Sequence, residues 1–223
     1  MRAAIAFAAA LAAAPAAACE VELILAMDVS RSVMNDEYDH QMLGLAAAFR
    51  DERVIELIGF AEGGVMATVT QWSGEGMQTQ SVPWRRIEAP EDARAFAAEI
   101  EMQDRHYFGA YTATGDALLH ARAISAQNPV ACRRKVIDVS GDGRRNRGAE
   151  PRAVADALAA EGYTINALAV LGAKPNPLDY YITHVIAGPG AFAEVADSFA
   201  DYPAAIRRKL LRELSPSFAM VDE

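Results

Sequence analysis

The chain has 223 residues, of which 52% are hydrophobic and 23% are charged, enough to bury one ordinary globular core. Its formal net charge is −9, which argues against binding to nucleic acid, because phosphates favour a basic face. An acidic protein can instead attract cations.

Residues 1–18 have the pattern of a secretory signal peptide. Arg2 gives a basic start, residues 3–14 form an apolar run rich in alanine, and small residues follow Pro15. The run is shorter than the roughly 20 apolar residues that span a bilayer, and no later segment is long and apolar enough to cross one. We therefore expect an exported protein, periplasmic or secreted, with a single domain over residues 19–223.

Strands and helices are expected to alternate along this domain. Residues 54–58 are too short a run to assign, and Pro83 favours a sheet edge for the strand that contains it. Asn35 or Asp36 is expected to cap the first helix. The expected strands cover 21–27, 65–72, 80–87, 135–139, 165–171 and 192–195, and the expected helices cover 35–49, 90–103, 114–127, 151–160, 178–186 and 203–214. This alternation predicts an α/β fold, a three-layer sandwich with a central, mostly parallel sheet.

A group of three oxygen-bearing side chains follows the first expected strand. Asp28, Ser30 and Ser32 stand at alternate positions, so a loop that leaves the strand can turn all three oxygens inward. Hard cations such as Mg²⁺ prefer oxygen ligands of this kind. Serines after a strand also commonly cap the next helix, so the triplet alone does not establish a metal site.

Two further loops bring the same chemistry. Thr112 and Thr114 stand where a helix begins, and Asp142 lies in a glycine turn just past another apolar strand. Each has an ordinary explanation, as a helix cap or as the polar tip of a turn. Together, at the carboxyl ends of parallel strands, all three loops fit one crevice of the type in which α/β proteins bind ligands.

With these residues in place, the chain resembles the von Willebrand factor A family, also called the integrin I-domain fold. The resemblance covers essentially the whole mature chain, and it is strongest to exported bacterial proteins of this fold whose function is unknown. It implies a metal-ion-dependent adhesion site made of five residues. By resemblance these are Asp28, Ser30, Ser32, Thr112 and Asp142.

The resemblance also implies how such a site works. A divalent cation, Mg²⁺ by preference and Mn²⁺ or Ca²⁺ as alternatives, would accept an acidic residue from a protein partner. Thr114 competes with Thr112 for the threonine position, and Arg31 replaces a frequent glycine between the two serines, which could weaken metal binding or attract an anionic ligand. Without a well-placed general base, we expect a binding protein and not an enzyme. A metal-dependent hydrolase and a structural domain with a vestigial site are the alternatives.

The two cysteines favour a disulfide. Cys19 lies nine residues before Asp28, and Cys132 lies ten before Asp142. If the two strands are parallel neighbours, both cysteines fall at the end opposite the aspartates, within reach of each other. Cys19 also follows small residues and could instead carry a lipid, although Ala16 stands where a lipoprotein signal usually has leucine.

Three other groups of polar residues have simpler interpretations. The histidines are scattered and show no zinc-site spacing. Asp138, inside a strand, is expected to pair with a neighbouring base and not to bind metal. Residues 144–147 form a basic loop that is either solvated or helps to receive an acidic partner.

Overall fold

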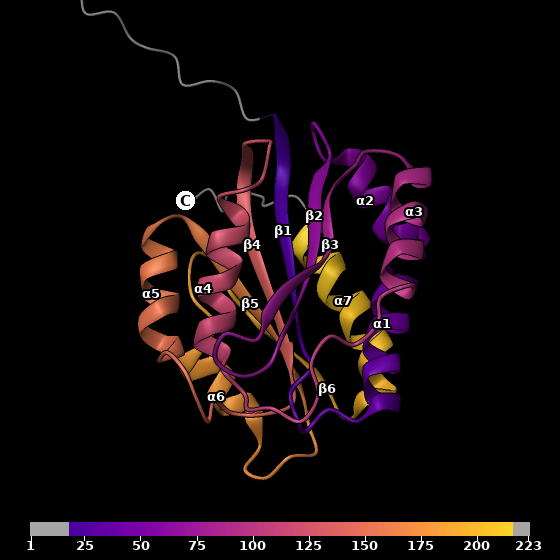
Figure 1. The fold of residues 1–223 in the computed structure, drawn as a ribbon. Coiled ribbons are helices and arrows are strands. Elements are labelled where there is room, and N and C mark those ends of the chain that lie inside the picture. The colour runs from indigo at the N-terminus through magenta and orange to yellow at the C-terminus, as the bar shows by residue number, and fades with distance from the viewer. Residues whose placement is uncertain (1–17, 216–223) are drawn as a thin grey trace, which may run out of the picture.

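Strand β1 (Cys19–Asp28) is buried along its whole length and lies at the centre of the sheet. It is parallel to both neighbours, β2 (Val65–Trp72) and β4 (Cys132–Gly141). The computed structural model describes residues 18–215 (Figure 1). The predicted signal peptide therefore lies outside the described residues, except for Ala18.

The sheet has six strands in the order β3-β2-β1-β4-β5-β6. Strands β5 (Tyr163–Val170) and β6 (Ala193–Ala196) continue the parallel pairing, whereas β3 (Gln78–Ile87) is antiparallel to β2 at the sheet edge, as Pro83 predicts. This is the strand order of a doubly wound sheet, in which ligands bind where the winding reverses, between β1 and β4. Asp28 ends β1, and Asp142 follows β4 at the same edge.

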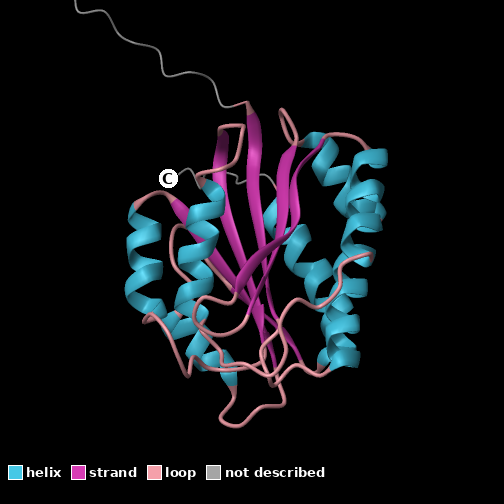
Figure 2. Cartoon of the chain, viewed as in Figure 1, coloured by secondary structure: helices cyan, strands magenta, loops and turns pink. Residues whose placement is uncertain are grey.

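Helices cover both faces of the sheet, which confirms the three-layer sandwich (Figures 1 and 2). Alternate residues of β1 enter different cores: Leu23 and Leu25 belong to one, and Ile24 and Ala26 to the other. One face is covered by α1 (Asn35–Arg50), α2 (Glu52–Phe60), α3 (Pro90–Glu101) and α7 (Tyr202–Leu214). A 3₁₀ turn, Phe199–Asp201, directly precedes α7. The other face is covered by α4 (Thr114–Ser125), α5 (Pro151–Ala160) and α6 (Pro177–His184).

The first two helices differ from expectation. Helix α1 is capped at Met34, not at Asn35 or Asp36, because the Met34 amide donates to the Glu37 carboxylate at 2.7 Å. Helix α2 is not predicted by the sequence pattern, because its apolar run, residues 54–58, is too short to show a period. It forms because the Asp51 side chain accepts hydrogen bonds from two amides of its first turn.

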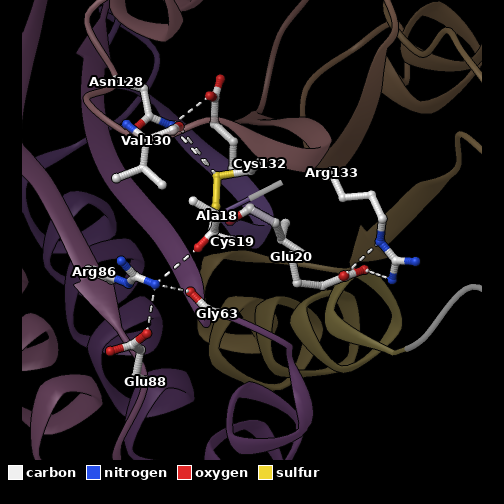
Figure 3. Close-up of a disulfide and its surroundings, with 12 residues drawn as sticks. Ala18, Cys19, Glu20, Gly63, Arg86, Glu88, Asn128, Val130, Cys132 and Arg133 are labelled. Carbon is white, nitrogen blue, oxygen red and sulfur yellow. Dashed lines mark hydrogen bonds and ion pairs between the residues drawn. A yellow bond between two sulfur atoms is a disulfide. The ribbon is translucent and has the colours of Figure 1, made fainter. Parts of the chain in front are cut away.

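A disulfide joins Cys19 and Cys132 at the amino ends of β1 and β4 (Figure 3). The two residues face each other in the β1–β4 register, and their Cα atoms lie 4.4 Å apart. The predicted pairing is therefore confirmed. Arg86 donates to the carbonyls of Ala18 and Gly63 beside it. No helix within residues 18–215 is long and apolar enough to cross a membrane.

Candidate metal centre

The loop after β1 folds back on its own aspartate. The Asp28 side chain is fully buried, and its Oδ1 accepts the Ser30 amide at 2.7 Å. The Ser30 and Ser32 hydroxyl oxygens lie 3.3 Å apart. The sequence-predicted triplet therefore presents its oxygens to one place, as the alternate spacing indicates.

The other two predicted residues meet this loop. Ser32 Oγ donates to Asp142 Oδ1 at 2.7 Å, and Thr112 Oγ1 donates to Ser30 Oγ at 3.3 Å. All five predicted residues are thus brought together by the carboxyl ends of β1 and β4 and the segment before α4. Thr114, the competing threonine, is buried at the start of α4, and its hydroxyl bonds to no group in the described chain. The geometry favours Thr112.

Arg105 fixes the Asp28 loop from outside. Its Nη2 donates to the carbonyls of Val29 and Ser30, at 3.0 and 2.9 Å, and its Nη1 donates to Asn35 Oδ1 at 3.2 Å. This arginine was missed in the sequence because it stands alone in a loop between two expected helices. Its bonds hold the loop carbonyls outward, so that the side-chain oxygens can face the crevice.

Asn146 fixes the threonine segment. Its side-chain oxygen accepts a hydrogen bond from the Thr112 backbone amide at 2.9 Å. The Asn146 backbone amide donates in turn to the Thr112 carbonyl at 3.0 Å. One residue of the basic loop 144–147 therefore has a structural role. A second link runs from the Ala149 amide to Asp116 Oδ2, at 2.7 Å, and joins the start of α4 to the loop after β4.

Gly141 lets two polar groups approach the end of β4. A Cβ atom there would overlap the Tyr181 hydroxyl and would lie 2.8 Å from Asp28 Oδ2. Tyr181, from α6, is fully buried, and no sequence pattern associates it with the site. Burial raises its pKa well above the usual value, as do the nearby Asp28 and Asp142 carboxylates, so its hydroxyl stays protonated.

The two carboxylates repel each other inside the fold. Burial, and then the charge of Asp142, raise the pKa of Asp28 to about 8, although the Ser30 hydrogen bonds and the Arg105 charge oppose this. Burial also raises the pKa of Asp142, against the Ser32 hydrogen bond. Two carboxylates held together in this way are poised to accept positive charge.

The donor set fits a hard divalent cation. Within residues 18–215, no group of three or more histidine, cysteine, aspartate or glutamate side chains could hold a metal, so a metal ion here would depend on the hydroxyls as well. Asp28 Oδ2 is buried and accepts no hydrogen bond from the described residues. A buried carboxylate oxygen without a partner is costly, and a cation would satisfy it.

Asp138 is not part of this cluster. It pairs with Lys209 of α7 at 2.6 Å, and both side chains are buried, which confirms the expected base partner.

Comparison with known proteins agrees with this architecture. Residues 18–218 match the family described as "Protein of unknown function (DUF1194)". The chain belongs to this family. No curated protein matched the sequence.

Comparison with solved structures identifies the fold. A von Willebrand factor type A structure from Catenulispora acidiphila is 18% identical, with a TM-score of 0.54, over 87% of this chain and 42% of that one. Proximal thread matrix protein 1 from mussel byssus is 21% identical, with a TM-score of 0.64, over 87% of this chain and 48% of its own. Manganese-loaded TRAP protein of Plasmodium vivax is 16% identical, with a TM-score of 0.56, over 87% of this chain and 74% of that one.

These likenesses establish the fold. The DUF1194 chain has the von Willebrand factor A fold, as its sequence motifs indicate. It spans about half the length of the mussel structure. Another form of the mussel protein is described with a zinc-occupied MIDAS motif, that is, a metal-ion-dependent adhesion site.

Proposed function

We propose that this protein is an exported, metal-dependent protein-binding module. The observation that carries the proposal is the convergence of Asp28, Ser30, Ser32, Thr112 and Asp142, with a buried Asp28 oxygen left without a partner. The same positions follow from the motif order in the sequence. A non-enzymatic role is consistent with the site, because these residues supply ligands and no evident general base.

The metal would be held by these five residues. Mg²⁺ suits an all-oxygen set that leaves room for water, and Mn²⁺ or Ca²⁺ are alternatives. Three of the five oxygens come from neutral hydroxyls, so the ion would keep its attraction for one more anionic ligand. The zinc-occupied mussel structure and the manganese-loaded TRAP structure support a divalent cation for this fold.

The ligand that completes the shell would be an acidic side chain of a protein partner. Ser32 is exposed beside the buried Asp28 and Ser30, so the cluster opens to solvent on one side. Metal and partner would then act together: the metal supplies a positive charge that the acidic chain otherwise lacks at this position.

Export is the second part of the proposal. Residues 1–18 have the composition of a signal peptide, and the Cys19–Cys132 disulfide suits an oxidising compartment, either the periplasm or the exterior. A disulfide occupies Cys19 and so disfavours lipid attachment there. The domain proposed for the mature chain covers residues 19–223.

Thermal unfolding tests the metal site. The purified protein, stripped of metal, is melted alone and with Mg²⁺, Mn²⁺ or Ca²⁺, beside Asp142→Ala and the surface control Asp156→Ala. At about 100 times the dissociation constant, an ion should add about 2.7 kcal/mol to the free energy of unfolding. The increase should vanish in Asp142→Ala and persist in the control. If no ion stabilises the wild type, a structural domain with a vestigial site replaces this proposal.

A further inference from the structure

A cavity opens directly beside the candidate metal centre. It has a volume of about 530 Å³, and its walls include Arg31, Ser32, Tyr111, Thr112 and Asn146. Ser32 and Thr112 belong to the five-oxygen cluster, so a ligand group in this cavity would be adjacent to one that binds the metal. Two segments of the cavity wall are joined, because the Arg31 amide donates to the Ala110 carbonyl at 3.0 Å.

Arg31 gives this cavity a positive charge, and Arg147 lies against one of its wall residues. Arg31 lies in its wall, and Arg147 lies over the Tyr111 ring at 4.6 Å from the ring centroid. Both arginines are exposed. Among the described residues, no ion pair involves either guanidinium, whereas the adjacent Arg145 is paired with Glu150. Neither charge is neutralised by an ion pair within the described chain, and Arg147 is held against the ring of Tyr111, a residue of the cavity wall.

A second cavity also borders Ser32 and has the opposite charge. Its volume is about 470 Å³, and its walls include Ser32, Glu37, Asp142 and Asp197. Ser32 therefore borders both a cationic cavity and an anionic one. Such an arrangement favours ligands with a matching order of charges and disfavours the reverse order.

We propose that the site recognises a peptide segment with two acidic side chains. One carboxylate would complete the metal shell, and the second would enter the cavity beside Arg31 and Arg147. A neutral or basic residue would face Glu37 and Asp197. On an extended chain, alternate side chains point the same way and lie about 7 Å apart, so the two acids would be two positions apart. This inference rests on the proposed metal-dependent function.

Immobilised synthetic peptides test it. Each has a central glutamate in a neutral background, with glutamate, glutamine or lysine two positions to either side. Binding of the protein is measured with Mg²⁺, with Mn²⁺ and with a chelator. The Glu–Glu peptides should retain up to about fivefold more protein than the Glu–Gln peptides, because an ion pair with an exposed arginine is worth at most about 1 kcal/mol. Chelation of the metal should release the protein from every peptide.

Charge reversal identifies the cavity. Arg31→Glu and Arg147→Glu should each abolish the preference for the second acid and favour the Glu–Lys peptides. The matched control Arg94→Glu, at an exposed position on α3, should keep the wild-type order.

Each other result overturns the inference. Equal retention of Glu–Glu and Glu–Gln peptides, or no retention while Mg²⁺ or Mn²⁺ still raises the melting temperature, rejects the second acid and leaves the metal site standing. An unchanged preference in both cavity variants rejects the assignment to Arg31 and Arg147. Absence of any metal-dependent stabilisation removes the proposed function and this inference together.

Discussion

Lys209 Nζ lies 2.6 Å from Asp138 Oδ1, and the two side chains are 0% and 1% exposed. This ion pair joins α7 to β4, four residues before Asp142. Lys209 also pairs with Glu213 at 2.6 Å, and Glu213 accepts a hydrogen bond from Asn166 at 2.8 Å. The last helix is thus fixed to the central sheet by one ammonium and two carboxylates, and the pKa of Asp138 is raised to about 7, by burial first, against the Lys209 charge.

Replacing the lysine should destabilise the fold strongly. Lys209→Met removes the only cation that forms an ion pair with the Asp138 and Glu213 carboxylates among the described residues, and leaves these two buried carboxylates to repel each other. Breaking a buried pair from one side costs about 3–5 kcal/mol, because the remaining charge is uncompensated. Urea denaturation at pH 7.5 measures this loss.

The neighbouring arginine is the control. Arg208 pairs with Glu194 at the surface, where its side chain is 52% exposed, so Arg208→Met should cost at most about 1 kcal/mol. Similar losses in the two variants would mean that the buried cluster contributes no more than a surface pair. Lys209→Met combined with Asp138→Asn and Glu213→Gln should recover much of the loss.

The metal-free protein should become less stable as pH rises. The pKa of Asp28 is about 8 in the fold against 3.8 as its ordinary value, so the folded state binds the proton more tightly. Stability from this group is fully present below pH 3.8 and is lost as pH rises through about 8, by an amount on the order of 5 kcal/mol. Metal binding needs the carboxylate, so stabilisation by Mg²⁺ should increase over the same range.

Asp28→Asn separates this effect from that of Asp138, whose pKa is raised in the same direction. The variant should lose the Asp28 part of the pH dependence and all stabilisation by Mg²⁺. Melting curves from pH 5 to 9, with a chelator and with Mg²⁺, give both readings. A pH dependence equal to that of the wild type would show that Asp28 is ionised in the metal-free fold.

The fold and three of the five residues of the cluster could be predicted from local patterns. Strand β1 is a continuous apolar run, and Asp28, Ser30 and Ser32 share one loop whose spacing shows in the sequence. Thr112 and Asp142 required the motif order of a family, since they lie 82 residues from Ser30 and 110 residues from Ser32. The cysteine pairing followed because the parallel register of β1 and β4 fixes both ends of the strands.

The groups that support the cluster could not be found in this way. Arg105 and Tyr181 are single residues in unremarkable segments, and only the packing of α6 and of the loop after α3 brings them to Asp28. Helix α2 was missed for a related reason: its cap at Asp51 is visible in the sequence, but its apolar run is too short to show a period. Long-range packing decides such contacts, and periodicity does not report it.

Adding one methyl group at position 141 should weaken metal binding about 10–100-fold. Gly141→Ala places a Cβ against the Tyr181 hydroxyl and 2.8 Å from Asp28 Oδ2, so one of these groups must move. Misplacing a ligand or its supporting group typically costs about 10–100-fold in metal affinity. Isothermal titration with Mn²⁺ measures the affinity.

Gly59→Ala is the matched control, since a Cβ at that helical position would meet no atom within 4 Å. It should leave Mn²⁺ affinity unchanged and raise stability by up to about 1 kcal/mol, because alanine is the better helix former. Undiminished Mn²⁺ affinity in Gly141→Ala would argue that Asp28 and Tyr181 can move without affecting the metal site. Restored affinity in Gly141→Ala combined with Tyr181→Phe would identify the hydroxyl as the obstacle.

Removing the disulfide should destabilise the domain without disturbing the metal centre. Cys19 and Cys132 close a loop with a sequence separation of 113, and cross-links of long loops stabilise proteins by about 2–5 kcal/mol, largely by restricting the unfolded chain. The double variant Cys19→Ala, Cys132→Ala should lose this amount in urea denaturation. The wild type should be as stable as the double variant under reducing conditions and more stable under oxidising ones.

The disulfide lies at the amino ends of β1 and β4, and the oxygen cluster lies at their carboxyl ends, so Mn²⁺ affinity should be unchanged at a temperature where the variant stays folded. Equal stability of the oxidised wild type and the double variant would show that the cross-link does not contribute to stability.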